Sequence, residues 1–312
     1  MTPNVGKTIP GIHHVTAISG PPQPNVDFYT RTLGQRLVKK TVNFDAPDTY
    51  HLYYGDHTGS PGTIMTFFPF VNAGPGRPGP GMASAHAYAV TAGAFDGLME
   101  RIALEGMDFG GPSERFGQRV LTLRDPDGAA VELIESNRTG GATLDGFHSA
   151  TLWERDPDPT ARVLTDIFGY VAAGEEREGD ITRLRFVAPG DARGHIIDII
   201  RSDDRAIARP GAGTIHHIAF RAETNAIQME WREKVASAGH QVTPQIDRQY
   251  FNAIYFREPG GVLFEIATDP PGFTADETLE TLGHALKLPP QHERLRARLE
   301  QTLPALNVSE PV

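Results

Sequence analysis

Gly11-Ile12-His13-His14-Val15-Thr16 is a short apolar run around a pair of histidines, and about 200 residues later the chain carries a second such run, Thr214-Ile215-His216-His217-Ile218-Ala219-Phe220. Apolar and β-branched residues on both sides of each pair are typical of a buried strand. Further on, Gly261-Val262-Leu263-Phe264-Glu265-Ile266 holds a carboxylate inside another strand-like run. Two imidazoles and one carboxylate are the ligand set of an open non-haem metal site. The function therefore depends on whether the fold brings these three strands together.

The His-His runs belong to a repeat. Strand signals recur about 60 to 75 residues apart, at 12–15, 85–88, 147–150 and 215–218. An amphipathic helical stretch that ends near a glycine follows each of them, at 26–33, 95–105, 160–168 and 227–238. Each unit finishes with a closing strand, at 63–68, 130–134, 196–200 and 263–266. Four unrelated stretches would not share these offsets, so the pattern predicts a β-α-β-β-β unit repeated four times.

Composition limits the classes of function. The chain has 312 residues, a formal net charge of −10 at pH 7 and no cysteine. The acidic balance argues against nucleic acid or an anionic membrane as the main partner. Without cysteine there are no disulfides, thiolate nucleophiles or Cys-zinc sites, so any metal must have nitrogen and oxygen ligands. No apolar run is long enough to span a bilayer and the first residues do not resemble a signal peptide, so we expect a cytoplasmic protein.

This organisation resembles the vicinal oxygen chelate superfamily, which includes glyoxalases and extradiol dioxygenases. The resemblance implies an α+β fold in which two βαβββ modules form one open mixed-sheet barrel. It also implies that metal ligands come from the first and the last strand of each module. On this basis we expect modules 1 to 4 at residues 8–72, 82–138, 145–203 and 211–270, followed by a C-terminal helical tail at 271–312.

Ligand chemistry can then decide which modules share a barrel. The aligned ligand positions hold His14 and Thr66 in module 1 and Ala87 and Glu132 in module 2. They hold Ser149 and Asp198 in module 3 and His217 and Glu265 in module 4. Pairing modules 1 and 2 gives too few ligands, and pairing modules 3 and 4 gives an unusually acidic set. Pairing 1 with 4 and 2 with 3 gives one complete site of His14, His217 and Glu265. A one-residue slip that replaces His14 by His148 is the alternative, although strand alternation disfavours it.

Several stretches resemble one group in particular, the ring-cleaving dioxygenases that include hydroquinone and chlorohydroquinone enzymes. The similar stretches are 11–16, 25–29, 33–34, 37–45, 50–56, 61–69 and 213–220. The resemblance implies Fe(II), with Mn(II) as the alternative metal, held by one histidine of module 1 and the His/Glu pair of module 4. It also implies an aromatic substrate and O2. The neighbouring residues that it implicates in catalysis are Arg248, Tyr255, His13, Thr16 and His216, although simple alternation points His13 and His216 away from the metal.

The sequence therefore predicts an Fe(II)-dependent dioxygenase that inserts O2 into a hydroquinone- or catechol-type ring. A glyoxalase-type lyase or isomerase is the alternative, but such enzymes usually have a carboxylate at both closing-strand positions, and Thr66 stands at one of them. A non-enzymatic small-molecule-binding protein of the same fold is a second alternative, which would need no metal triad. Leucines at helical spacing between 279 and 303 predict an amphipathic lid or subunit contact in the tail, and we expect a homo-oligomer.

Overall fold

The computed structural model describes residues 8–140, 142–202 and 207–308, and within them one order of elements occurs four times. The first-strand, helix and closing-strand signals of the sequence correspond to elements of all four modules. The bounds in module 1 are β1 Ile12–Ser19, α1 Pro22–Asp27 with a π-helical turn Phe28–Thr32, β2 Arg36–Asn43, β3 Ala46–Gly55 and β4 Ile64–Pro69. In module 2 they are β5 Met82–Val90, α2 Phe95–Leu104, β6 Phe109–Arg115, β7 Gln118–Arg124 and β8 Ala130–Glu135.

Modules 3 and 4 repeat the order. Module 3 has β9 Leu144–Trp153, α3 Asp158–Arg162 with a π-helical turn Val163–Ile167, β10 Val171–Glu178, β11 Ile181–Val187 and β12 Ile196–Arg201. Module 4 has β13 Thr214–Ala222, α4 Asn225–Ser237, β14 Ile246–Asp247, β15 Phe251–Arg257 and β16 Leu263–Pro271. None of the helices in the described part of the chain is both long and apolar enough to cross a membrane.

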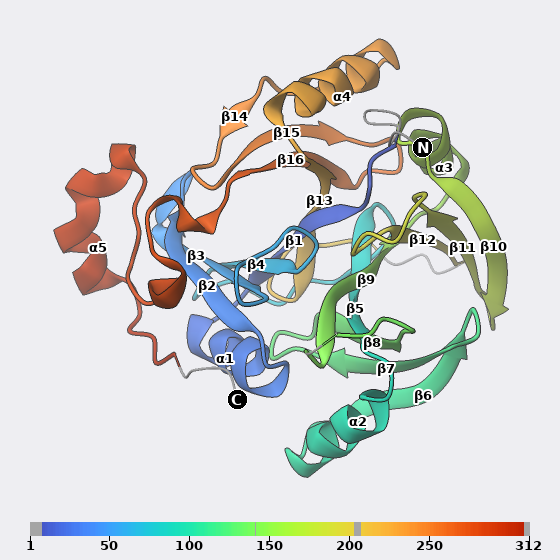
Figure 1. Ribbon diagram of the computed structural model, residues 1–312, viewed down its shortest axis with the longest axis horizontal. Helices are drawn as coiled ribbons and strands as arrows, with labels where there is room; N and C mark the ends of the chain where they lie inside the picture. Colours follow the sequence, from blue (N-terminus) through green and yellow to red (C-terminus); the bar gives the residue numbers. More distant parts are fainter. Residues whose placement is uncertain (1–7, 141, 203–206, 309–312) are drawn as a thin grey trace.

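The strands form two eight-stranded mixed sheets, and the predicted pairing of modules is confirmed. One sheet has the order β14-β15-β16-β13-β1-β4-β3-β2 and joins modules 4 and 1, while the other has the order β10-β11-β12-β9-β5-β8-β7-β6 and joins modules 3 and 2. Figure 1 shows the two curved sheets side by side, with α2, α3 and α4 on the outside. The ring centroids of Phe168 in module 3 and Phe220 in module 4 lie 4.8 Å apart, and one continuous apolar core joins the two barrels.

Two β-bulges lie at the centre of the first sheet, and each contains one His-His pair. Along the antiparallel pair β1–β13, Ile12 is opposite Phe220 and His14 is opposite Ala219, which leaves His13 as an extra residue. Further along, Thr16 is opposite His217 and Ala17 is opposite Ile215, which leaves His216 as an extra residue. Because a bulge interrupts strand alternation, both members of a pair can lie near one site. The expectation that His216 points away from the metal site is therefore wrong: its side chain lines the same cavity as His217.

The second sheet has the same bulges, and its register corrects one aligned position. Ser84 and His148 are the corresponding extra residues along β5–β9, which has one further register shift between Tyr88 and Val90. Thr16 pairs with Thr66 across parallel strands in module 1, and Ala87 pairs with Glu132 in the same way in module 2. The counterpart of His14 is therefore Ala85, two residues before the aligned Ala87, and neither alanine can be a ligand. The alternative with His148 is wrong, because β9 belongs to the other sheet and His148 is the counterpart of His216.

The C-terminal tail packs on the outer strands of the first sheet. It consists of short 3-10 segments, Phe273–Ala275, Leu279–Thr281 and Pro290–Leu295, and of α5, Arg296–Thr302, and Figure 1 shows α5 beside β2 and β3. Buried Lys39 of β2 forms ion pairs with Asp276, at 2.6 Å, and with Glu277 of the tail. His292 hydrogen-bonds to the carbonyl of Phe44, beside the cavity described below. The tail thus holds the β2–β3 turn in place within a single chain.

Candidate metal centre

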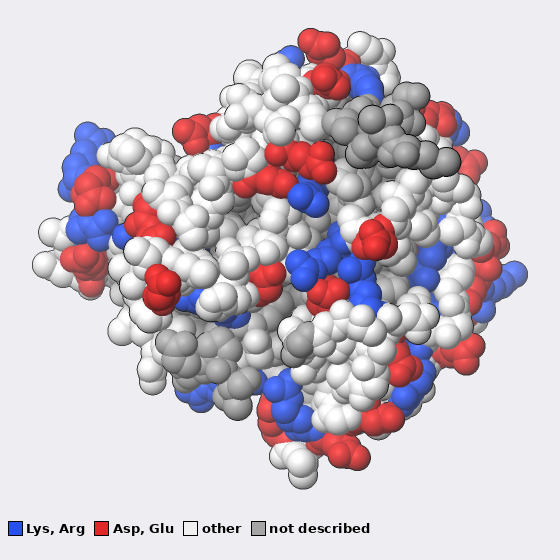
Figure 2. All heavy atoms as spheres, in the orientation of Figure 1, with Lys and Arg blue, Asp and Glu red and all other residues white. Residues whose placement is uncertain are grey.

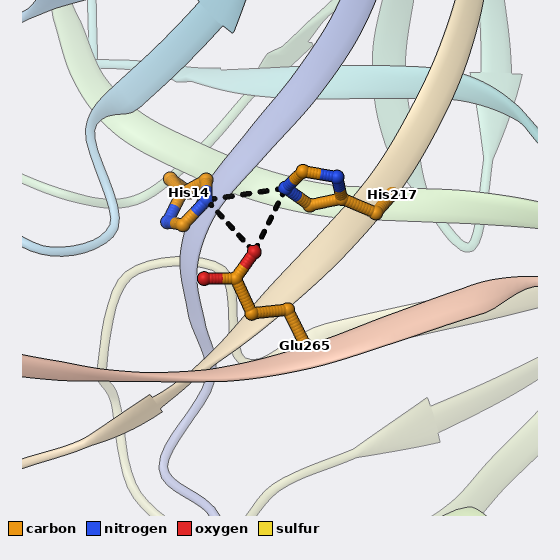
Figure 3. A group of neighbouring side chains, drawn as sticks. All are labelled: His14, His217 and Glu265. Atoms are coloured by element: carbon orange, nitrogen blue, oxygen red, sulfur yellow. Dashed lines mark hydrogen bonds and ion pairs between the residues drawn. The ribbon is translucent and has the colours of Figure 1, made fainter. Parts of the chain in front are cut away.

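Three side chains from three neighbouring strands converge at the centre of the first sheet: His14 of β1, His217 of β13 and Glu265 of β16 (Figure 3). Nε2 of His217 lies 2.9 Å from Oε2 of Glu265, and Nε2 of His14 lies 3.4 Å from both of these atoms. Metal–ligand bonds of about 2.1 Å at right angles put neighbouring ligand atoms about 3.0 Å apart. The triangle therefore has the size of one face of an octahedral site.

Burial makes this cluster costly without a cation. All three side chains are buried, and among the described residues only the two imidazoles form ion pairs with Oε2 of Glu265, which they do only when they are protonated. Taking a charge out of water without pairing it is strongly unfavourable. Burial acts to raise the pKa of Glu265, yet His14 and His217 outweigh it and hold that pKa well below its ordinary value. Burial lowers the pKa of His217 despite the nearby carboxylate, which favours a neutral imidazole. The donor set fits a divalent metal ion.

The first histidine of each pair contacts the outer nitrogen of the second. Nδ1 of His13 lies 2.9 Å from Nδ1 of His14, and Nδ1 of His216 lies 2.7 Å from Nδ1 of His217. If His14 and His217 bind a metal through Nε2, each carries its proton on Nδ1 and donates it to its partner. His13 and His216 are then acceptors at Nδ1 and carry their own hydrogen on Nε2. The two bulges thus provide matching supports for the two ligands.

The three residues open into a cavity of about 600 Å³ that apolar and aromatic side chains dominate. Tyr255 and Arg248 line it, as the resemblance implied, and Nε of Arg248 donates to the hydroxyl of Tyr255 at 3.3 Å. Arg248 also forms a 3.1 Å ion pair with Asp45 at the β2–β3 turn. Burial and the nearby carboxylate of Glu265 raise the pKa of Tyr255 well above 10, although Arg248 acts in the opposite direction. The tyrosine therefore carries a hydrogen that it can donate.

The two remaining residues implicated by the resemblance lie outside the cavity wall. His13 is buried against Phe251, with ring centroids 5.5 Å apart. Thr16 is fully buried, and its hydroxyl lies 2.8 Å from the hydroxyl of Thr66. Thr66 occupies the closing-strand position that corresponds to Glu265, since Thr16 pairs with Thr66 as Ala219 pairs with Glu265. A threonine pair thus stands where a fourth ligand would be.

Two cavity residues, His51 and Tyr53 of β3, did not emerge as candidates from the sequence. Nε2 of His51 lies 2.9 Å from the hydroxyl of Thr66, and its Nδ1 lies 2.8 Å from the hydroxyl of Tyr53. Tyr53 pairs with Thr66 as Tyr255 pairs with Glu265, so the two tyrosines are counterparts in modules 1 and 4. The available signal was the two-residue spacing of His51 and Tyr53 in a strand, which puts both on one face.

In the second barrel, arginines neutralise the carboxylates at the matching positions. Arg115 forms a two-pronged contact with Glu132 at 2.7 and 2.9 Å. Arg185 does the same with Asp198 at 2.9 Å for both bonds, and Arg183 adds a third bond to Asp198 at 3.3 Å. On the face in Figure 2, acidic and basic side chains lie next to one another over this sheet. Among the described residues, only His14, His217 and Glu265 form a cluster of three such metal-binding groups.

Comparison with known proteins agrees with this architecture. The model of the Glyoxalase/Bleomycin resistance protein/Dioxygenase superfamily matches residues 11–133 and 146–266. The chain belongs to this superfamily. It is 45% identical over 317 residues to a Bacillus subtilis protein named "Putative ring-cleaving dioxygenase MhqO", covering 98% of this chain and 99% of the relative. It is 34% identical over 316 residues to the chlorohydroquinone/hydroquinone 1,2-dioxygenase of Sphingobium indicum, covering 95% and 96%.

Solved structures of superfamily members share the fold. A crystal structure described as a putative dioxygenase from Bacillus subtilis superposes with a TM-score of 0.90 at 45% identity, over 97% of this chain and 99% of the other. Glyoxalase I from Zea mays gives a TM-score of 0.63 at 14% identity, over 88% and 97%. The maize enzyme thus shares the arrangement of modules, whereas the bacterial relatives, at 34% to 45% identity, bear names that specify dioxygenase chemistry.

Proposed function

We propose that the protein is an Fe(II)-dependent ring-cleaving dioxygenase that inserts O2 into a dihydroxylated aromatic ring of hydroquinone or catechol type. The observation that carries this proposal is the convergence of His14, His217 and Glu265 within 4.8 Å of one another at the end of an apolar cavity. Three protein ligands on one face leave about three positions of an octahedral ion for substrates. The names of relatives at 34% to 45% identity support the same reaction class.

When bound, Fe(II) would acidify a coordinated phenol and allow electrons to pass from the ring to O2. The protein would contribute position, hydrogen bonds and exclusion of water. Tyr255 and Arg248 form one polar wall, in which the tyrosine hydroxyl can donate to an oxyanion that develops on the substrate while the arginine balances its charge. His216 lines the cavity beside His217 and, with its Nδ1 used as an acceptor, offers Nε2–H as a second donor.

A glyoxalase-type isomerase would need a base at the closing strand of module 1. Thr66 stands there, and its hydroxyl is already bonded to Thr16 and His51. A threonine hydroxyl that is held by these hydrogen bonds is a poor base at neutral pH. We therefore do not adopt the isomerase as the function. The intact triad also disfavours a binding protein without a metal, because such a protein would keep a buried Glu265 without a cation.

The test is anaerobic reconstitution of the metal-free protein with Fe(II), followed by O2 uptake with hydroquinones and catechols. We expect about one Fe(II) per chain and one O2 consumed per diol. His217→Ala should abolish both, whereas His57→Ala, which removes an exposed histidine away from the cavity, should abolish neither. A thiol–aldehyde adduct is assayed in parallel. Isomerisation of the adduct without O2 uptake on any diol would overturn the proposal.

A further inference from the structure

The floor of the cavity extends well beyond the metal ligands. β1 and β4 are parallel neighbours, with Thr16 opposite Thr66 and Ile18 opposite Phe68. Alternate residues of a strand lie on one face, so Ile18 is on the same face as His14, about 13 Å further along β1. Ile18 and Phe68 line the same cavity as the metal ligands. The cavity therefore extends from the metal ligands to Ile18 and Phe68, although Thr16, which lies between His14 and Ile18 on β1, does not line it.

The cavity is larger than a single diol ring requires. A dihydroxybenzene has eight non-hydrogen atoms and occupies at most roughly 240 Å³, even at the ~30 Å³ that a whole water molecule takes in the liquid. The cavity measures about 600 Å³, so more than half of it is left over. The lining includes the apolar side chains of Phe44, Phe70, Ile246 and Leu263. The surplus volume is therefore mainly apolar.

At its apolar end the cavity adjoins a second one. This second cavity, of about 940 Å³, shares Ile18 and Phe70 with the first, and Leu303 and Pro304 of the tail form part of its far wall. Ile18 is only half-buried, which is consistent with free space on both sides of it. Asp45 and Arg248 of the first cavity pair with each other, and the second cavity has one acidic and one basic residue in its lining, Asp48 and Arg209.

We infer that the substrate ring carries an apolar substituent of several carbons, which lies along β1 and β4 and ends between Ile18 and Phe70. The inference rests on the proposed function for the identity of the ring, and it extends that function by naming the substituent. An apolar chain in this position gains by leaving water, in proportion to the area that it buries. Between Ile18 and Phe70 a carboxylate would lose its hydration, and Arg248 of this cavity is already paired with Asp45, so diols with a charged substituent should be poor ligands.

The experiment measures binding and turnover across a series of unsubstituted, methyl-, propyl- and pentyl-hydroquinone, with a carboxylate-bearing analogue. Dissociation constants are determined without O2, on the metal-free and on the Fe(II)-loaded protein. We expect affinity to rise about fourfold per methylene, which is the fold-change equivalent of about 0.8 kcal/mol. In the loaded protein kcat/KM should rise in parallel. Equal affinities along the series, or tighter binding of the carboxylate analogue, would overturn the inference.

Variants then locate the substituent. Ile18→Asp should lower the ratio of pentyl- to unsubstituted-hydroquinone affinity at least tenfold, and Ile18→Trp should lower it by shortening the cavity. Leu104→Trp, at an exposed site on α2 of the other barrel, should keep the wild-type ratio. An unchanged ratio in a folded Ile18 variant refutes the placement, and the wild-type series decides the question if neither variant folds. Chain-length-dependent binding without O2 uptake would reject the dioxygenase reaction alone, whereas turnover without chain-length dependence would reject the substituent alone.

Discussion

Replacing His216 by phenylalanine tests whether the first histidine of each pair supports the metal ligand beside it. Nδ1 of His216 lies 2.7 Å from Nδ1 of His217 and is the only hydrogen-bond acceptor that the described residues provide for that nitrogen. Phenylalanine keeps a flat ring and removes the acceptor. Loss of such an outer partner typically costs 10- to 100-fold in metal affinity, or about 1.4 to 2.7 kcal/mol. We therefore expect the Fe(II) dissociation constant of His216→Phe to rise by this factor.

The expected cost in stability is small. His216 is exposed to the cavity, so its replacement leaves no buried void, and the free energy of unfolding of the metal-free protein should change by less than about 0.5 kcal/mol. The matching variant His13→Phe should weaken metal binding by a similar factor, because Nδ1 of His13 lies 2.9 Å from Nδ1 of His14. His13 is buried, so this variant should also be less stable.

The assay is competition for the metal against a chromophoric chelator under anaerobic conditions, which does not depend on turnover. His57→Phe is the control, since it changes an exposed histidine outside the cavity. His216→Asn, which can place an amide oxygen near the same nitrogen, should recover part of the lost affinity. Wild-type metal affinity in both His13→Phe and His216→Phe would refute the supporting role of the bulges.

Three further predictions concern other parts of the molecule. Tyr255→Phe should retain its metal, measured by metal analysis, and lose about 10²- to 10⁴-fold in single-turnover rate, so an unchanged rate would exclude the tyrosine from proton donation. Burial and Glu258 raise the pKa of Glu154 to about 8, so the folded protein keeps a proton that the unfolded chain releases above pH 4.5. The free energy of unfolding should therefore fall between pH 4.5 and 8, by up to about 1.4 kcal/mol per pH unit. Glu154→Gln should raise the urea midpoint at pH 8 but not at pH 4.5. Equal shifts of the midpoint at the two pH values would contradict this. Lys39→Met should cost about 3 to 5 kcal/mol in urea unfolding, because it leaves the buried carboxylate of Glu277 without a cation, and the loss should shrink when Asp276 and Glu277 are both replaced by amides.

Local sequence patterns were sufficient for the modules, and their pairing followed once the resemblance to the superfamily placed the metal ligands on the first and last strand of each module. Strand and helix periodicity are properties of short segments, and the repeat supplied four independent readings of the same unit. The choice of modules 1 and 4 followed from ligand chemistry, since only His14, His217 and Glu265 make a complete set among the aligned positions. The structure brings these three together from β1, β13 and β16.

Local patterns failed where a position depends on the partner strand. Alternation within one strand cannot reveal an extra residue, because a bulge is defined by the residue that lies opposite it. For this reason His216 was placed on the wrong face, and Ala87 was aligned with His14 two residues out of register. Likewise, His51 contacts the residues around the metal site through the hydroxyl of Thr66, which lies on another strand, so its own strand did not reveal this contact.

The sequence by itself thus determined which residues can bind a metal and which modules must pair to bring them together. Ligand identity and periodicity are properties of short segments, so they can be recognised without the fold. Only the tertiary structure decided how the ligands are supported, how the second barrel neutralises Asp198 with Arg183 and Arg185, and how the cavity reaches from the ligands to Ile18. These features arise from the register between strands that are distant in the chain, and register is settled by the packing of whole sheets.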